Sequence, residues 1–165
     1  MPKLHYLIGD ALKPIKTPAI NCHCCNSIGG WGRGYVLAIR AMYPAAEKAY
    51  LNWFATGSPK LGDVQYVQVT SGLCIANMIG QEGVQWQGKI PPIRYEALEK
   101  CLKDVYTLAT DENAIVTMPR IGCVLAGGTW NVIGPMVEKL MTVDTYVYTL
   151  ESQKDRWNDK YEGTA

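Results

Sequence analysis

The sequence predicts a three-layer α/β/α fold built on a mixed sheet of roughly six strands. Short apolar segments alternate with segments of helical periodicity along the 165 residues, and two glycine-rich stretches each follow an apolar segment and precede a helical one. A chain of this length has the size of one domain and can bury roughly 70% of its unfolded surface. We therefore expect one core domain over residues 1–150, followed by a polar C-terminal extension, residues 151–165, that packs only weakly.

The first half of the chain predicts two strands and two helices. Residues 4–8 and 19–25 are apolar runs, and the second is apolar on both faces, as expected for a strand in the interior of a sheet covered on both sides. Apolar residues at helical spacing predict a helix over residues 35–43, which Pro44 ends, and another over residues 45–54.

The second half predicts four strands and two long helices. Residues 64–70 and 73–79, joined by Ser71-Gly72, are typical of a β-hairpin. Residues 80–92 hold three glycines and two prolines without periodicity, which indicates a long loop of the kind that often carries function. The remaining predicted elements are a helix over 94–109, a buried strand over 114–118, a helix over about 130–141 and a last strand over 145–150.

Charge and cysteine content restrict the partners and the compartment. Sixteen Lys and Arg against fifteen Asp and Glu give a net charge of +1, too small to neutralise many phosphates of a nucleic acid. No apolar run approaches the ~20 residues that span a bilayer, and the start of the chain lacks the apolar core of a secretion signal. We expect a cytoplasmic monomer with neither a nucleic-acid nor a membrane partner, in which the six cysteines are reduced.

The cluster Cys22-His23-Cys24-Cys25 does not predict a metal site. Within a strand, Cys22 and Cys24 share one face while His23 and Cys25 share the other, so neither face offers four ligands. No second pair at a spacing such as CxxC occurs in the chain. We expect no metal and no cofactor.

The two glycine-rich stretches predict a site for an anionic ligand. Four glycines lie between Gly29 and Gly34, and a second stretch runs from Pro119 to Gly128. Glycine lets backbone amides turn outward at positive φ, and ligands of α/β sheets lie at the carboxyl ends of strands. If the two preceding strands are neighbours, the two loops can hold a diphosphate between their amides. No GxGxxG follows the first strand and no GKS or GKT occurs, which argues against the Rossmann and P-loop motifs.

Several motifs together resemble the macrodomains, over roughly residues 3–150. The likeness is greatest to the small stand-alone branch that contains the yeast-type ADP-ribose 1″-phosphate phosphatase, phage and bacterial relatives, and terminal ADP-ribose glycohydrolases. Residues 77–81 and 91–95 also look like the phage and bacterial members. The resemblance implies a macrodomain fold and an ADP-ribose cleft. The motifs are Gly9-Asp10, the run from Cys24 to Gly34, the run from Tyr43 to Lys48, and the run from Met118 to Gly128.

The resemblance also implies a role for each position of the cleft. Asp10 with the amide of Ala11 would read the adenine, and Tyr148 and Leu150 would flank the adenine and its ribose. The first loop would lie against the distal ribose and the diphosphate, and the second loop against the diphosphate. The implied loop contacts are Ser27, Gly30, Trp31, Gly32, Arg33 and Gly34, then Ile121, Gly122, Cys123, Val124, Leu125, Ala126, Gly127, Gly128 and Thr129.

His23 and Asn26 are the implied catalytic residues. An imidazole near the distal ribose can act as a general base, and Asn26 can orient the ribose or a water. From spacing alone, however, His23 in an apolar strand is more often a satisfied core residue, and Asp10 can simply cap a turn. Arg120 after Pro119 is expected to be structural, paired with a carboxylate or with carbonyls below the loop.

Three functions follow from this resemblance. The first is hydrolysis of the phosphate of ADP-ribose 1″-phosphate, and the alternative is binding of ADP-ribose or a related NAD-derived nucleotide without turnover. The third, removal of ADP-ribose from proteins, is ranked last, because the lysine and aspartate of the glycohydrolases are replaced here by a lysine-free segment, residues 79–81, and by Ala126. Ser27, where relatives commonly have Asp, and Val124, where they have glycine, are further departures.

Overall fold

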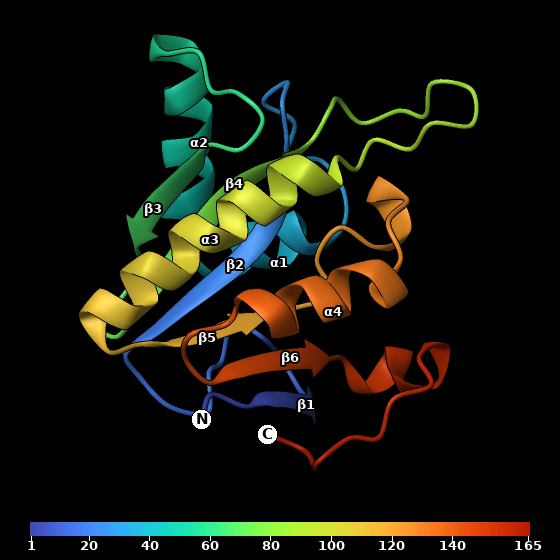
Figure 1. Cartoon of the computed structure of the whole chain (residues 1–165). Helices are drawn as coiled ribbons and strands as arrows, with labels where there is room; N and C mark the ends of the chain where they lie inside the picture. Colours follow the sequence, from blue (N-terminus) through green and yellow to red (C-terminus); the bar gives the residue numbers. More distant parts are fainter.

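A six-stranded mixed sheet lies between two layers of helices in the computed structural model, which describes all 165 residues (Figure 1). The strand order is β1-β6-β5-β2-β4-β3, and every neighbouring pair is parallel except β3 and β4. This arrangement confirms the predicted three-layer fold. The strands are β1 (Leu4–Ile8), β2 (Ala19–Asn26), β3 (Val64–Gln68), β4 (Leu73–Gln81), β5 (Ile115–Met118) and β6 (Thr145–Thr149).

Each face of the sheet is covered by two helices. Apolar residues of α3 (Tyr95–Glu112) and α4 (Trp130–Leu140) pack on one face and form the larger core. On the other face, α1 (Tyr35–Met42) and α2 (Pro44–Thr56) form the smaller core. Two short 3-10 helices, η1 (Val124–Ala126) and η2 (Glu151–Arg156), lie in the segments after β5 and β6.

The central strand β2 serves both cores, as its pattern predicts. Cys22 and Cys24 pack into the larger core, whereas Cys25 packs into the smaller one. All six cysteines are free thiols. Because β2 lies between β5 and β4, its carboxyl end is at the middle of the sheet.

Element boundaries differ from the predicted ones by a few residues. Helix α3 continues to Glu112 instead of ending at Ala109, and Asn113 ends it in the left-handed conformation that helix ends favour. The polar residues at 110–112 carry no apolar stripe, so the sequence gives no signal for this last turn. Pro44 both ends α1 and begins α2, where its missing N–H costs no hydrogen bond.

The C-terminal extension is bound along β1, which corrects the expectation that it packs only weakly. The Glu162 amide donates to the Tyr6 carbonyl (2.8 Å), and the Ala165 amide donates to the Ile8 carbonyl (2.8 Å). The amide of Ile8 donates in turn to the Gly163 carbonyl (2.9 Å). The extension therefore shields the free edge of the first strand, a contact that no periodic pattern announces.

None of the helices combines the length and the apolar character needed to cross a bilayer.

Candidate functional site

A cavity of about 800 Å³ opens at the carboxyl ends of β2 and β5. These strands are hydrogen-bonded neighbours, so the first loop (residues 27–34) and the second loop (residues 119–129) face each other across it. A third loop (residues 82–92) and η2 contribute further walls. The expected juxtaposition of the two glycine-rich loops is therefore present in the fold.

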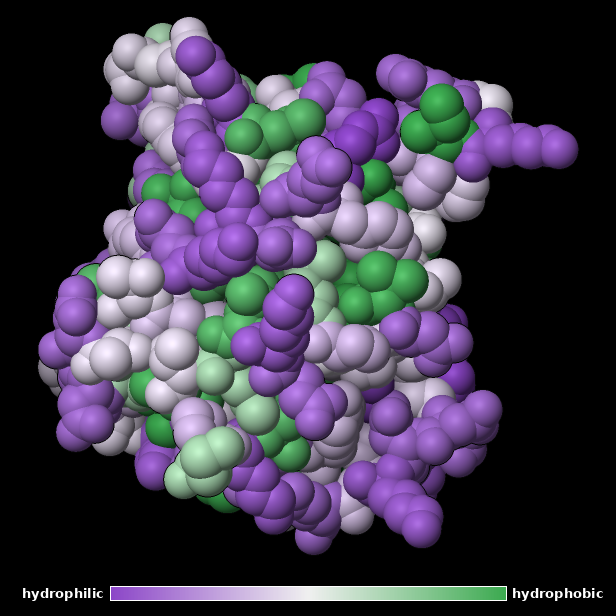
Figure 2. Space-filling model, viewed as in Figure 1, coloured by the Kyte–Doolittle hydropathy of each residue, from purple (hydrophilic) through white to green (hydrophobic).

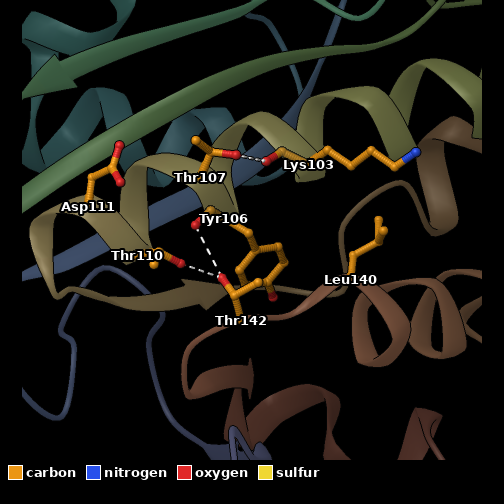
Figure 3. A pocket seen from close by; sticks show the side chains of 7 residues that line it. All are labelled: Lys103, Tyr106, Thr107, Thr110, Asp111, Leu140 and Thr142. Carbon is orange, nitrogen blue, oxygen red and sulfur yellow. Dashed lines mark hydrogen bonds between the residues drawn. The ribbon is translucent and has the colours of Figure 1, made fainter.

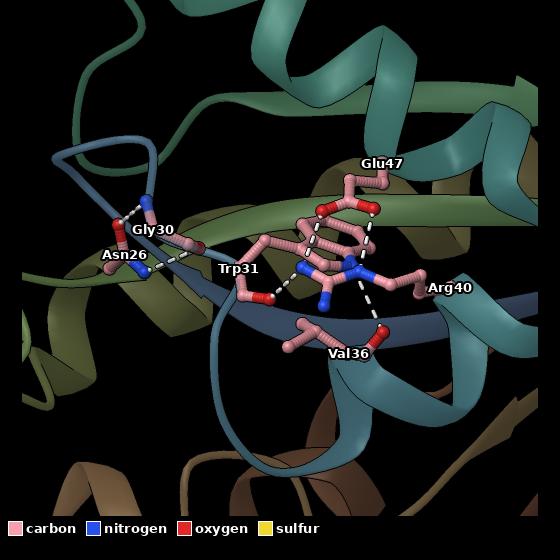
Figure 4. A network of polar contacts seen from close by, with 6 residues as sticks. All are labelled: Asn26, Gly30, Trp31, Val36, Arg40 and Glu47. Atoms are coloured by element: carbon pink, nitrogen blue, oxygen red, sulfur yellow. Dashed lines mark hydrogen bonds and ion pairs between the residues drawn. The ribbon is translucent and has the colours of Figure 1, made fainter.

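The first loop is held in place by the side chain of Asn26 (Figure 4). Its Nδ2 donates to the Gly30 carbonyl (2.8 Å), while its Oδ1 accepts from the amides of Gly30 (2.8 Å) and Ile28 (3.1 Å). The Tyr50 hydroxyl, from α2, donates to the Asn26 carbonyl (2.7 Å). The Asn26 amide is thus occupied by the loop itself, which makes Asn26 a positioning residue in this structure.

A second set of contacts fixes the middle of the same loop (Figure 4). Arg40 of α1 donates to both carboxylate oxygens of Glu47 (2.9 and 2.7 Å) and to the Trp31 carbonyl (2.9 Å). The Trp31 indole is buried and donates to the Val36 carbonyl (2.9 Å). Trp31 therefore anchors the loop to α1, and its side chain is not among those lining the cavity.

The second loop is closed on itself and contains one strained residue. The Gly128 amide donates to the Gly122 carbonyl (2.8 Å), and a Cβ at Gly128 would lie 2.4 Å from that oxygen. Gly122 and Gly127 have φ values of 71° and 80°. Val124 has a φ of 61°, which is unfavourable for a β-branched residue, and its side chain is 57% exposed at the cavity.

The third loop bridges the two glycine-rich loops. The Gly83 amide donates to Ser27 Oγ (2.9 Å), and the Ile93 amide, just past the loop, donates to the Ala126 carbonyl (2.9 Å). The Trp86 indole lies against Gly127, where an added Cβ would be 2.7 Å from its ring. Ser27, one of the two positions that differ from the resembled relatives, thus ties the third loop to the first.

Trp86 and its neighbours were not named as site residues from the sequence. Val84 and Trp86 line the cavity although both are about half exposed. Figure 2 shows hydrophobic side chains on this projecting loop, surrounded by hydrophilic ones. The only sequence signal was the length and composition of the loop, which indicated function without indicating which side chains turn toward the cavity.

His23 lies at the wall of the cavity but is only 2% exposed. Its Nε2 is 2.6 Å from Asn77 Oδ1, and Asn77 Nδ2 donates to the Ala46 carbonyl (3.3 Å). Because that contact orients the Asn77 amide, Nε2 of His23 is the protonated nitrogen and Nδ1 carries the lone pair. Burial lowers the pKa of His23 from 6.5 to about 4, so the imidazole is neutral at pH 7.

The only residues with permanent charge around the cavity are three arginines, Arg33, Arg120 and Arg156. No carboxylate lines it, although the chain as a whole has nearly equal numbers of acids and bases. Arg120 is paired with Asp159, as its predicted structural role requires, whereas Arg33 and Arg156 make no ion pair or side-chain hydrogen bond. An anionic ligand would therefore meet only positive charge here.

The cavity brings together twelve of the predicted site residues and leaves nine outside its lining. Asp10 accepts from the Leu12 amide (2.9 Å), and the buried Tyr148 hydroxyl accepts from the Ile15 amide (2.9 Å), so the predicted adenine contacts stay a prediction. The twelve are His23, Asn26, Gly30, Gly32, Arg33, Gly34, Ile121, Gly122, Cys123, Val124, Leu125 and Ala126. The nine are Asp10, Ala11, Ser27, Trp31, Gly127, Gly128, Thr129, Tyr148 and Leu150.

A second hollow of about 390 Å³ lies between α3 and the end of α4 (Figure 3). Each of its hydroxyl groups has a partner in the protein: Thr110 and Thr142 bond to each other across 2.7 Å, Thr107 donates to the Lys103 carbonyl, and Tyr106 bonds to Thr145. The charges at its rim, Lys103 and Asp111, have opposite sign. It therefore lacks the unpaired like-charged groups that distinguish the larger cavity.

Comparison with solved structures gives close matches over most of the chain. A protein of unknown function from Bacteroides thetaiotaomicron is 40% identical, with a TM-score of 0.86 over 89% of this chain and 98% of that one. A macrodomain protein from Streptomyces coelicolor is 38% identical, with a TM-score of 0.78 over 89% of this chain and 99% of that one. A mutant macrodomain of Oceanobacillus iheyensis, solved with ADPR, shares the fold at 17% identity and a TM-score of 0.70, covering 93% of this chain and 88% of that one.

Curated relatives are more distant in sequence. The ADP-ribose 1″-phosphate phosphatase of Lodderomyces elongisporus is 24% identical over 156 residues, covering 88% of this chain and 98% of that one. A chromodomain-helicase-DNA-binding protein 1-like of Danio rerio is 32% identical over 139 residues, but these make up 13% of its length. No protein-family model matches the chain.

Proposed function

Because this chain belongs to the macrodomain family, we propose that it binds ADP-ribose and hydrolyses the phosphate of ADP-ribose 1″-phosphate. The observation that carries the proposal is the cavity between two glycine-rich loops whose permanent charges are all arginines. Backbone amides and guanidinium groups are the donors that phosphate oxygens require. The phosphatase of L. elongisporus, similar along nearly its whole length, supports the choice of substrate.

In the proposed reaction, a water oxygen forms a bond to phosphorus as the bond between phosphorus and the 1″ oxygen breaks. Nδ1 of His23, which carries a lone pair and lies 3.7 Å from Cys25 Sγ, accepts a proton of that water. The departing oxygen takes up one proton from solvent, and the imidazolium then returns its proton to solvent. The products are inorganic phosphate and ADP-ribose. Asn26 acts by holding Gly30 and Ile28 in position, and Arg33 is the candidate partner of the terminal phosphate.

Binding without turnover is the second candidate, and the surroundings of His23 favour it. A general base works best when its pKa lies near the working pH, whereas burial lowers the pKa of His23 to about 4. Removal of ADP-ribose from proteins stays last, because Ala126 and the segment 79–81 supply neither aspartate nor lysine.

Two measurements on the purified protein test these candidates. Calorimetric titration with ADP-ribose should give a micromolar dissociation constant, and absence of heat would reject both. Incubation with ADP-ribose 1″-phosphate should then release phosphate, and a His23→Ala variant that still binds ADP-ribose should lose that release. Binding without any phosphate release would select the second candidate.

The proposal also covers the compartment, the oligomeric state and the partners of the protein. We place it in the cytoplasm of a bacterium or in a phage-infected cell, as a monomer without a nucleic-acid or membrane partner. Six free cysteines support a reducing compartment, the net charge of +1 is too small for extended phosphate backbones, and the relatives at 38% and 40% identity are bacterial. Size-exclusion chromatography with light scattering tests the oligomeric state.

A further inference from the structure

We propose that the C-terminal extension is a fixed wall of the ligand cavity and that its Arg156 binds a phosphate of the ligand. The inference rests on the proposed function, because it concerns the same cavity. Arg156 and Gln153, both in η2, line the cavity although they lie beyond the last strand of the sheet.

The extension is anchored on a buried cation at the base of the second loop. The guanidinium of Arg120 lies 4.7 Å from the ring centroid of Trp157 and 5.0 Å from those of Tyr6 and Trp130. Asp159 forms an ion pair with the same guanidinium, whose side chain is 5% exposed. Trp157 and Asp159 both come from the extension, so without it Arg120 would lose its carboxylate partner and one of three aromatic neighbours.

The extension is also bound to the sheet on both sides of Trp157 and Asp159. Beyond Asp159, the extension forms backbone hydrogen bonds with β1, at Tyr6 and Ile8. On the other side of the anchor, η2 is joined directly to β6, and the Gln153 amide donates to the Leu150 carbonyl (2.8 Å). The segment that carries Arg156 is therefore fixed between β6 and the Arg120 anchor.

Arg156 and Arg33 belong to two segments that flank the second loop in the order of the sheet. Arg33 belongs to the loop that leaves β2, Arg156 to the helix that follows β6, and β5, from which the second loop leaves, lies between those strands. Neither guanidinium has a partner in the protein. Two unpaired guanidinium groups, from segments that flank a glycine-rich loop and line one cavity, suit a ligand with two linked phosphates, and Arg156 would contact the phosphate on the β6 side.

The test compares Arg156→Ala with a matched control, Lys154→Ala. Lys154 lies in the same short helix, but its ammonium group is already paired with Glu151. Calorimetry is carried out with ADP-ribose and, separately, with inorganic pyrophosphate. Loss of a charge-assisted contact should weaken binding by about tenfold or more in Arg156→Ala, leave Lys154→Ala unchanged, and be partly restored in Arg156→Lys. Thermal unfolding checks that the exposed substitutions leave the fold intact.

Each outcome separates this inference from the proposed function. If the protein binds ADP-ribose and Arg156→Ala binds it as well as Lys154→Ala does, the inference is wrong and the proposed function stands. If the protein fails to bind ADP-ribose but binds pyrophosphate in an Arg156-dependent way, the proposed function is wrong and the inference stands. Binding of neither probe rejects both.

Discussion

His23 lies in β2 at the wall of the cavity, and its burial makes the stability of the fold depend on pH. Its pKa in the folded chain, about 4, lies below the ordinary value of 6.5. As the pH falls below 6.5, the unfolded chain therefore takes up the proton first, and the folded state loses stability. The contribution of neutral His23 to the free energy of unfolding is complete above pH 6.5 and is lost progressively as the pH approaches 4.

A substitution can isolate this effect. Between pH 7 and pH 5 the wild-type chain should lose about 2 kcal/mol more of its unfolding free energy than a His23→Gln variant, at 1.36 kcal/mol for each pKa unit. Urea unfolding of both proteins at the two pH values measures the difference. His5, the only other histidine, is present in both and cancels. Equal losses would show that His23 titrates normally in the folded chain.

Val124 is the residue whose backbone conformation least suits its side chain. With φ at 61°, its Cβ is crowded against the following carbonyl, whereas Asn113, the other non-glycine residue at positive φ, is of a type that tolerates this region. Val124→Gly should raise the unfolding free energy by about 1 kcal/mol, because glycine carries no Cβ. Val124→Ala keeps the Cβ and should show no such gain. Denaturant unfolding of the wild type and the two variants measures this difference, and equal stability of the Val124→Gly and Val124→Ala variants would contradict the prediction.

At the scale of elements, the third loop depends on the absence of a side chain in the second. A Cβ on Gly127 would lie 2.5 Å from the Pro91 Cβ and 2.7 Å from the Trp86 ring. Gly127→Ala should therefore displace the third loop, cost about 1 to 3 kcal/mol of stability and change the fluorescence of Trp86.

Gly88→Ala is the matched control for this change. Gly88 also has a positive φ, 64°, but nothing lies within 4 Å of its added Cβ. The Gly88→Ala variant should therefore show the effect of backbone strain alone, without displacing Trp86. Similar effects of the two substitutions would mean that Trp86 does not rest on Gly127.

The elements were largely predictable because periodicity and glycine content are local properties of the chain. The apolar run of residues 19–25, the hairpin at residues 64–79 and the two glycine-rich stretches were each recognised from neighbouring residues. The anchor of Arg120 by Trp157 and Asp159 was not, because it joins parts of the chain that no pattern links. The same reason explains why Trp86, Gln153 and Arg156 were missed as cavity residues.

At the scale of the whole molecule, the ion pair between Arg120 and Asp159 joins the extension to the core. Asp159→Ala should lower the unfolding free energy by about 2 to 3 kcal/mol, since it leaves a buried guanidinium without its carboxylate. Asp155→Ala, in the same extension but without an ion pair, should change it by less than about 0.5 kcal/mol. Denaturant unfolding of both variants measures the difference, and equal effects would show that the pair adds nothing to stability.

The position of β1 at the edge of the sheet has a consequence for synthesis of the chain. Its only partners are β6 and the extension, and the contact of Lys3 with Asp144 spans 141 residues. At ribosomal rates of about 5–20 residues per second, the first strand waits on the order of ten seconds for its partner to emerge. During that interval β2, β4, β3 and β5 can already pair, so residues 4–8 should be the part of the nascent chain most accessible to chaperones.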